Sequence, residues 1–519
     1  MSRSNRHLLN LARGPTPTAD SSLILRARRG LIESYFDNGF PYSMKLSEHT
    51  SCVNALAFSR GDGRWMASAG DDRCVRLWDL HRENTSVAST FSGHSANIFT
   101  VDFSASNKYL ISGALDDRVL KYNLEVDYAS HVSAMPNDVF AQHSASIRAV
   151  SCHSFEDEVF LSASEDGSVV LHDGRAGSNP SRAQATLQAD QEMTDVQYHP
   201  TAEHLFLTSD QAGNVCLRDT RLAFGPLRQR TRDGVVRKYI TTLTRSSKGM
   251  ARPDASSVCF NSDGTKFAVT FLHYLPTIYS VSDPVPIATC SGRNFPDGNP
   301  PPSGERTYKN ATTVKHGSFG GPGDGYYTAG SDDFRGYIWK IPPASALVEQ
   351  RETISDIDWN SASDPGAIAF TDPRHSSSIY VPMELSTPLF HLNGHHSIVN
   401  TALMHPTLPL IATAGIERHV VLHSPTASVP FSEGALNRTT TEIRHLPVTS
   451  AGARAQMRRL LLGTPGADPH DSGEEEAAIM LFDEILRTEG DADAFSSHPF
   501  VFSDSESDSD RDPPDEYDT

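Results

Sequence analysis

The feature of this chain that most constrains its fold is a unit that returns along most of its length. Each unit has a histidine, an apolar run of strand length, a polar turn, a second run with Ser or Thr among small residues, an acidic turn and a third apolar run. The clearest copies begin near His49, Gly93, Gln142 and Gly394. A period of this length is typical of an array whose units pack against one another. The short runs between polar turns predict that every unit is a small β-sheet.

Polar residues hold the same places in successive units. Counting back six residues from the aromatic position of the third run reaches an acidic residue in five units. With the pair Trp78-Asp79, the pattern resembles the WD repeat, in which the His, the Ser or Thr, the turn acid and the Trp form one hydrogen-bonded set. The resemblance implies that these sets fix the sheets. The residues concerned are His49, Ser68, Asp72 and Trp78; His94, Ser112 and Asp116; His143, Ser162 and Asp166; Asp333 and Trp339; and His395 and Glu417.

Two degenerate units, Met193–Arg221 and Ser256–Val281, bring the count to seven. We therefore predict an all-β fold, a seven-bladed WD-repeat β-propeller, because closure of such a ring removes exposed sheet edges. The lone strand Tyr42–Leu46 is predicted to complete the last blade. Residues 342–392 are interpreted as an insertion within a blade, and an eighth blade built from Ile354–Val381 is the alternative.

Composition divides the rest of the chain. Residues 1–41 are expected to form a basic N-terminal arm with a helix, 42–425 the propeller with a basic loop at 222–255, 426–467 a linker and 468–519 an acidic tail. The tail has 18 acidic and 2 basic residues, which leaves only −3 of the net charge of −19 for the rest. Such a segment buries too little apolar area to offset chain entropy, so we expect it to be largely disordered. Within it, Glu474–Gly490 has apolar residues at helical spacing, which fits either a partner-binding helix or a transient one.

The sequence offers no catalytic residues, metal ligands or cofactor motif. The repeat histidines are explained by their structural positions, and the pair His395-His396 has no Cys or acidic cluster at ligand spacing. The stretch Gly320–Gly325 lacks the Lys-Ser/Thr of a phosphate loop. We therefore expect no enzyme, no metal and no cofactor. Six scattered cysteines without a CxxC pair, and no apolar run long enough for a membrane span, predict an intracellular protein of the nucleus or cytoplasm.

Two successive units end in the same pattern, Asp-x-Arg. Asp173 and Arg175 close one unit and Asp219 and Arg221 close the next, so two cations leave equivalent points of adjacent blades. A guanidinium offers several rigid donors, and two of them on one rim suit an acidic or carbonyl-rich protein surface. For any single motif, the simpler interpretation is that the arginine pairs with its own aspartate.

Tandem Asp-x-Arg endings in a WD propeller resemble those of the DCAF family, the substrate receptors of cullin-4 RING ubiquitin ligases. The segments "GSDDFRGYIWKIP" and "HPTLPLIATAGIE" are similar to the branch of factors five, six and eight, most of all factor five, and the resemblance covers about residues 26–425. It implies that Asp173, Arg175, Asp219 and Arg221 dock on the ligase's propeller adaptor.

The family also places a helical N-terminal arm against the adaptor. Here Leu23–Gly39 fits that role, with Arg26, Arg28 and Arg29 as its cations, although a solvated leader is an equal alternative. One departure concerns the residue before Asp-x-Arg, commonly Trp in the family. His172 and Arg218 stand there in this chain, so we expect looser packing of the strand ends.

The resemblance implies a non-catalytic substrate receptor that binds the cullin-4 ligase adaptor and presents a propeller face to a protein substrate, which the sequence does not identify. The alternative is a chromatin- or histone-associated WD-repeat scaffold without a ligase role, for which the acidic tail would meet a basic partner. Nucleic acid is not the expected ligand. The basic loop offers only Phe224 and Tyr239 for stacking, and the acidic tail would compete for it.

Overall fold

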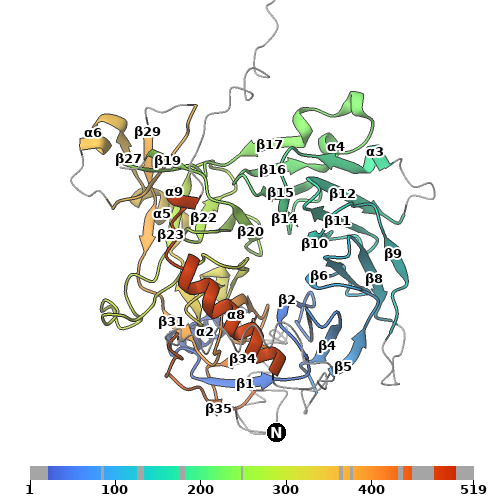
Figure 1. Ribbon diagram of the computed structural model, residues 1–519, viewed down its shortest axis with the longest axis horizontal. Coiled ribbons are helices and arrows are strands. Elements are labelled where there is room, and N and C mark those ends of the chain that lie inside the picture. Colours follow the sequence, from blue (N-terminus) through green and yellow to red (C-terminus); the bar gives the residue numbers. More distant parts are fainter. Residues whose placement is uncertain are drawn as a thin grey trace, which may run out of the picture.

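Each repeated unit folds into an antiparallel sheet whose neighbouring strands are joined by the polar turns. The computed structural model describes residues 21–82, 87–125, 134–175, 182–246, 249–361, 366–374, 378–429, 436–446 and 473–497. Seven sheets stand radially around one axis (Figure 1). Their first strands form a closed inner ring in the order β2, β6, β10, β14, β20, β24, β32 and back to β2. The chain is an all-β, seven-bladed propeller.

The first four blades have four strands each. These are β2 (Val53–Phe58), β3 (Trp65–Gly70), β4 (Val75–Asp79) and β5 (Val87–Phe91); β6 (Ile98–Phe103), β7 (Tyr109–Ala114), β8 (Val119–Asn123) and β9 (Asp138–Phe140); β10 (Ile147–Cys152), β11 (Val159–Ser164), β12 (Ser168–Asp173) and β13 (Thr186–Gln188); and β14 (Met193–Tyr198), β15 (Leu205–Asp210), β16 (Val215–Asp219) and β17 (Val235–Lys238). A short helix, α3 (Arg182–Ala185), precedes β13. Buried apolar residues of neighbouring sheets form the core between the blades.

The last three blades contain strands that are distant in sequence. The fifth blade has β20 (Ala255–Phe260), β21 (Lys266–Phe271), β22 (Thr277–Ser280), β23 (Pro286–Cys290) and, parallel to β23, β30 (Met383–Leu385). The sixth blade has β24 (Gly317–Gly320), β25 (Tyr326–Gly330), β26 (Gly336–Lys340) and β31 (Phe390–Leu392). The seventh blade has β32 (Val399–Met404), β33 (Ile411–Gly415), β34 (Val420–Ser424), β1 (Tyr42–Leu46) and β35 (Asn437–Arg438). β1 runs antiparallel to β34, with Leu46 opposite Val420. A strand from the N-terminal side therefore closes the ring, as the sequence predicts.

The propeller has two faces, which differ in the loops that they carry. In the third blade Ile147, where β10 begins, pairs with Ser164, where β11 ends, so the turn between β11 and β12 lies at that face. Val159, where β11 begins, pairs with Asp173, where β12 ends. We call the first the front face, which Figure 1 turns toward the viewer, and the second the back face. Every third strand thus ends at the back face.

The chain between β26 and β31 leaves the sixth blade and returns to it. This segment holds α5 (Ala344–Gln350), β27 (Glu352–Ser355), α6 (Asp356–Ser361), β28 (Ala369–Thr371), β29 (Ser378–Val381) and β30. β27, β28 and β29 form a sheet with β18 (Leu243–Arg245) and β19 (Gly249–Ala251), outside the inner ring. The segment Ile354–Val381 therefore builds an accessory sheet and not an eighth blade, because it pairs with residues 243–245 instead of joining the ring.

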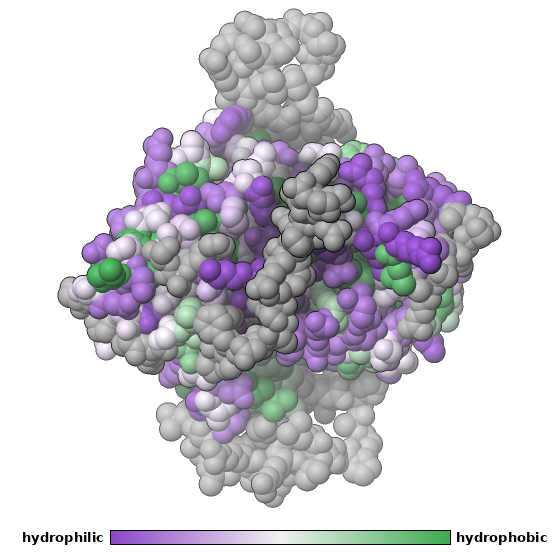
Figure 2. Space-filling view, turned by 90° about the horizontal axis from the view of Figure 1, so that it is seen from above, coloured by the Kyte–Doolittle hydropathy of each residue, from purple (hydrophilic) through white to green (hydrophobic). Residues whose placement is uncertain are grey.

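Residues 222–255 are not the single exposed loop that their charge suggested. They contain β17, β18 and β19, and also η1 (Leu227–Gln229) and η2 (Arg232–Gly234), after the short helix α4 (Thr220–Ala223). β17 is the outer strand of the fourth blade, with Cys216 of β16 opposite Lys238. Its side chains alternate between half-buried and exposed, as at a sheet edge, where basic residues are tolerated well. The many charged residues made this outer strand hard to predict from the sequence. The described surface is mostly hydrophilic where the molecule is seen from above (Figure 2).

Helices stand on both faces. α2 (Ser21–Asp37) contacts the turn η3 (Pro322–Asp324), which joins β24 to β25 on the back face. α8 (Gly473–Glu489) crosses the front face, followed by α9 (Ala494–Ser497) (Figure 1). The described part of the tail expected to be disordered is thus helical, because Ile479, Phe482 and Leu486 pack on the propeller. Residues 468–472 and 498–519 lie outside the described part of the chain. None of the helices described is long and apolar enough to cross a membrane.

Candidate protein-binding face

The two arginines of the repeated Asp-x-Arg pattern leave β12 and β16 at the back face. Nε and Nη2 of Arg175 donate to the two carboxylate oxygens of Asp173, both at 2.9 Å. The same two bonds from Arg221 to Asp219 measure 3.0 and 2.6 Å. These hydrogen bonds lower the pKa of both aspartates. Each ionised carboxylate therefore holds its guanidinium in one orientation.

Both arginine side chains remain partly exposed although their guanidiniums are bonded to the aspartates. Half of the Arg175 side chain and two thirds of the Arg221 side chain are exposed. Arg175 also has one nitrogen 3.2 Å from Glu156. The pKa of both arginines is raised, chiefly by the hydrogen bond to their own aspartate, and the charge of Glu203 adds to both. The structure thus brings the two cations to one rim, with Glu203 within electrostatic reach of each.

The residues before the motif do not loosen the strand ends. His172 Nε2 lies 2.8 Å from Ser162 Oγ, and its ring stacks on a neighbouring phenylalanine at 4.3 Å between centroids. Arg218 Nε donates to Thr208 Oγ1 at 2.9 Å. Both take over the bond that a Trp makes in the first blade, from its indole to a serine of the second strand. The looser packing expected from the missing Trp is therefore not seen.

Two exposed apolar side chains lie close to the arginines in sequence. Phe155, 58% exposed, is in the back-face turn before β11, next to Glu156, which pairs with Arg175. Leu222, 38% exposed, follows Arg221 in α4. The repeat pattern signals neither, and the only clue in the sequence is an apolar residue in a polar turn beside the motif. An apolar anchor next to an oriented arginine is typical of a protein-binding hot spot.

The N-terminal helix shares the back face but lies on the sixth blade. Phe36 of α2 stacks on Tyr326 of β25, with 4.4 Å between ring centroids, and is almost fully buried. Arg29 is largely exposed and pairs with Glu33 one turn later, at 2.9 Å. Arg26 and Arg28 lie in the first half of the same helix. The arm therefore presents Arg29 on the same face as Arg175 and Arg221, across the ring from them.

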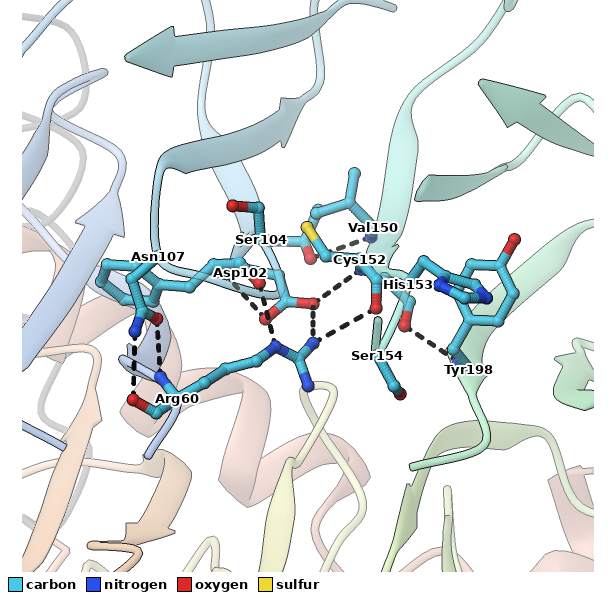
Figure 3. A network of polar contacts seen from close by, with 12 residues as sticks. Arg60, Asp102, Ser104, Asn107, Val150, Cys152, His153, Ser154 and Tyr198 are labelled. Carbon is cyan, nitrogen blue, oxygen red and sulfur yellow. Dashed lines mark hydrogen bonds and ion pairs between the residues drawn. The ribbon is translucent and has the colours of Figure 1, made fainter. Parts of the chain in front are cut away.

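The central channel opens at the back face, and a half-buried polar network joins the first three blades there (Figure 3). Arg60 donates to the carbonyl oxygens of Phe103 and Cys152, both at 3.2 Å. Asp102 accepts the backbone N–H of Cys152 at 2.8 Å. The adjoining cavity measures about 370 Å³. One side chain thus links the first blade to the second and the third at this face.

In the first blade the predicted residues form one chain of hydrogen bonds. The Trp78 indole, which can only donate, bonds Ser68 Oγ at 2.8 Å. Ser68 bonds His49 Nε2 at 2.7 Å, and His49 Nδ1 bonds Asp72 at 2.9 Å. Burial would raise the pKa of Asp72, but the hydrogen bond from His49 and the charge of Arg76 lower it to about 2. The set keeps one ionised acid in the front-face turn.

Three other blades bring their predicted residues together in the same way. The bonds run from His94 to Ser112 (2.8 Å) and Asp116 (3.1 Å), and from His395 to Thr413 and Glu417 (both 2.8 Å). His143 bonds Ser162 at 2.7 Å and Ser168 at 2.9 Å, and Ser168 in turn bonds Asp166, which lies 3.4 Å from the imidazole. These residues fix the blades and face the interior.

The sixth blade departs from this arrangement. Asp333 accepts the hydroxyl of Tyr337 at 2.5 Å, and the Trp339 indole donates to the carbonyl oxygen of Ser291 at 2.8 Å. Near the start of the first strand, Lys315 forms a buried ion pair with Asp332 at 2.7 Å, and the adjacent His316 is not among the described hydrogen-bond partners of Asp333. Asp333 and Trp339 are therefore in register with the repeat but do not form its set.

One histidine cluster has the composition of a metal site. His395, Glu417 and His419 offer ligand atoms within 4.8 Å of one another, and His396 Nδ1 lies 3.1 Å from Glu417. The sequence next to His395 and His396 has no acidic residue, and the carboxylate near them is that of Glu417, in the turn after β33. Both ring nitrogens of His395 are already bonded, to Glu417 and Thr413. A cation here would break the set that fixes the blade, so we assign no metal.

Comparisons with known proteins agree with this geometry. Residues 41–79, 85–123 and 135–173 match the family model described as WD domain, G-beta repeat. DDB1- and CUL4-associated factor 5 of Mus musculus and of Homo sapiens are each 29% identical over 387 residues, which is 74% of this chain and 34% of theirs. WD and tetratricopeptide repeats protein 1 of Homo sapiens is 33% identical over 157 residues, 30% of this chain and 22% of its own.

The chain spans about a third of the length of the factor 5 proteins that it matches. It is a WD-repeat β-propeller protein that resembles the DCAF family, most of all factor five.

Proposed function

We propose that this protein is a substrate receptor of a cullin-4 RING E3 ubiquitin ligase and that its back face binds the ligase adaptor, DDB1. The name of the factor 5 relatives associates them with DDB1 and CUL4. The observation that carries the proposal is the pair of partly exposed arginines on adjacent blades, each oriented by its own aspartate. The receptor is non-catalytic and recruits its protein substrate through another face.

The geometry favours an interface with a few dominant contacts. A guanidinium that is already held in place loses less entropy on binding than a free one, so each bond that it makes adds more to affinity. Phe155 and Leu222 supply apolar area beside the two cations. α2 adds Arg29, with Arg26 and Arg28 in the same helix, at the far side of the same face. An adaptor that spans the channel mouth would contact both the rim with Arg175 and Arg221 and the helix α2.

The six cysteines, all within the described residues, are unpaired, and four of them are buried. This fits residence in a reducing compartment, the nucleus or cytoplasm. The buried thiols serve as small core residues.

The test is the affinity of the purified protein for DDB1, measured by biolayer interferometry. The variant Arg175→Ala/Arg221→Ala should bind at least about 100-fold more weakly, since truncation of a buried interface arginine costs about 2 kcal/mol or more. The matched control is Arg82→Ala. Arg82 is as exposed and lies 3.4 Å from Asp79, where the third strand of the first blade ends at the back face.

The control should change affinity by less than about threefold, as expected for a rim charge. Thermal melting shows whether each variant is folded. If the folded double variant binds DDB1 as the wild type does, the arginines are structural. If the wild type does not bind, the ligase role fails.

One observation favours the second candidate, a chromatin- or histone-associated scaffold. A front-face cavity of about 480 Å³ has four carboxylates in its wall, from Asp71, Glu165, Glu192 and Asp254. Such a mouth suits a basic peptide. Binding of a histone-tail peptide by a chain that does not bind DDB1 would support this role over the ligase.

A further inference from the structure

The front face carries a helix that behaves as a bound ligand of the propeller. We call residues 473–497, with α8 and α9, the clasp. Ile479, Phe482 and Leu486 of α8 pack against Phe334 and Ile398, together with a few neighbours from the front-face turns of the first, sixth and seventh blades. α8 crosses in front of the ring while α2 lies behind it (Figure 1). The clasp thus covers the face opposite Arg175 and Arg221.

Between described residues, four ion pairs join the clasp to the rest of the chain, and these four have the same polarity. The clasp supplies the acid and the rest of the chain supplies the base. The pairs are Glu475 with Arg418 (2.9 Å), Asp483 with Arg444 (2.7 Å), Asp491 with Lys309 (2.9 Å) and Asp493 with Arg245 (3.0 Å). A helix that only filled a gap in the core would not need this uniform separation of charge. The surface that α8 and α9 contact therefore combines apolar residues with these four cations, and Phe482 also lines the acidic front-face cavity described above.

The pair between Asp483 and Arg444 is the most specific of the four. Nη1 and Nη2 of Arg444 donate to the two oxygens of Asp483 at 2.8 and 2.7 Å, and Asp483 is buried. Arg444 also donates to the carbonyl oxygen of His396 and lies over the ring of Phe334, 4.9 Å from its centroid. Its guanidinium is thus oriented before it meets a carboxylate.

The other three pairs are partly exposed, and exposed ion pairs are individually weak. The binding of the clasp is strengthened chiefly by its covalent connection to the propeller, because this connection keeps its effective concentration at the groove high. A separate helix of the same chemistry would meet the same apolar residues and the same cations. The groove can therefore exchange one acidic helix for another.

We propose that this groove is a docking site for an acidic amphipathic helix of a partner protein, and that the clasp occupies it in the isolated chain. The groove consists of Cys52, Phe334, Ile398 and Ile416 with the cations Arg245, Lys309, Arg418 and Arg444. The partner helix carries apolar residues at the spacing of Ile479, Phe482 and Leu486. It carries carboxylates in the places of Glu475 and Asp483. This site is independent of the adaptor site proposed above.

The experiment uses the full chain with the clasp opened by Ile479→Asp/Phe482→Asp. Hydrogen–deuterium exchange verifies that residues 473–489 lose protection while the propeller strands keep it. The probe is a fluorescein-labelled peptide of residues 473–497, and its binding is followed by fluorescence anisotropy. We expect the opened chain to bind the probe at least tenfold more tightly than the wild type, whose groove is occupied.

Two peptide variants separate recognition from simple charge attraction. Asp483→Asn removes the carboxylate that faces Arg444, and Glu484→Gln removes the neighbouring one, which pairs with Arg487 inside the helix. The first should weaken binding at least tenfold and the second less than threefold. A designed peptide that keeps only the apolar and acidic positions of the clasp should bind within a few-fold of the probe.

Equal binding of the probe to the wild-type and opened chains would overturn the proposal, as would equal loss with both peptide variants. Failure of the designed peptide would limit the groove to its own clasp and exclude a partner helix. Loss of binding on adding Arg444→Glu to the opened chain, with the propeller strands still protected, would support the groove as the site.

Discussion

His172 and His423 occupy the position where the first blade has Trp78. Each places Nε2 at 2.8 Å from the hydroxyl of a second strand, and neither Nδ1 has a hydrogen-bond partner among the described residues. Burial lowers the pKa of both to about 3. Both imidazoles are therefore neutral in the folded protein, and each replaces an indole with a group that can titrate.

The sign of their effect on stability follows from linkage. A histidine with a pKa of about 3 when folded and about 6.5 when unfolded takes up a proton on unfolding as the pH falls below 6.5. Each should then lower the free energy of unfolding by up to about 1.4 kcal/mol per pH unit between those values, and by nothing above them.

We expect the variant His172→Trp/His423→Trp to lose less thermal stability than the wild type between pH 7 and pH 5.5. The measurement is the difference in Tm between the two pH values, which cancels any constant cost of fitting the indoles. His81→Trp, at an exposed histidine outside the repeat set, is the control. Identical pH dependence in the wild type and the double variant would contradict the assignment.

Single residues also show how far the sequence could predict the structure. The spacing of the repeat placed His49, Ser68, Asp72 and Trp78 correctly, because the register between strands fixes which side chains meet. The same spacing selected Trp339, whose indole bonds a backbone carbonyl instead. Its blade lacks the bonded His, Ser or Thr and acid that the first blade has, and counting residues along the sequence cannot show whether those bonds form. Phe155 and its exposure depend on how a turn folds, which no pattern records.

At the scale of elements, β1 is the strand on which closure depends. It pairs with β34 over five residues and carries β35 on its other edge. Leu46 joins the core between the first and seventh blades. Without β1, the edge of β34 would present unpaired N–H and C=O groups, which are prone to association.

Two truncations distinguish the role of β1 in closing the ring from the role of the N-terminal arm in binding. Removal of residues 1–46 should lower Tm by more than about 2 °C and cause oligomers, because strand pairing and buried apolar area worth more than about 2 kcal/mol are lost. Removal of residues 1–41 keeps β1 and should leave the protein monomeric, with weaker binding to DDB1. Melting curves and size-exclusion chromatography read both effects. A monomeric chain lacking 1–46 with unchanged Tm would show that β1 does not hold the ring.

Elements were predictable where period and polarity agreed. β1 was, because a lone strand before the first unit matched a missing strand after the last. β17 was not predictable, because it is a short outer strand with two basic residues, and only one of its faces packs against the blade. α8 had apolar residues at helical spacing, but the face that it covers combines turns of three blades, and that surface exists only after the ring closes.

At the scale of the whole molecule, the two faces have different electrostatic roles. The back face presents arginines that are held by neighbouring acids but remain partly exposed. The front face keeps its cations covered by an acidic helix. Most of the net charge of −19 lies in residues 468–519, and the rest of the chain carries only −3. The attraction that holds the clasp is therefore local and comes from the cations that it contacts.

Salt should therefore open the clasp before it affects the propeller. An increase from about 0.1 M to about 1 M NaCl shortens the Debye length from about 10 Å to about 3 Å and screens the exposed ion pairs. Deuterium uptake in residues 473–489 should rise, while uptake in β2 and β6 stays unchanged. The variant Lys309→Gln/Arg418→Gln should already show the higher uptake at low salt. Uptake that does not respond to salt would mean that apolar packing alone holds α8.

The pairing of β1 with β34 also has a consequence for biosynthesis. The ribosome makes β1 before any blade and β34 after six of them. At about 5–20 residues per second, the interval between Leu46 and Val420 takes on the order of a minute. During that time the nascent first strand has no partner, and the growing arc has open edges at both ends. Chaperones that bind extended apolar segments would have this interval in which to act, and a pause in translation before residue 420 would prolong it.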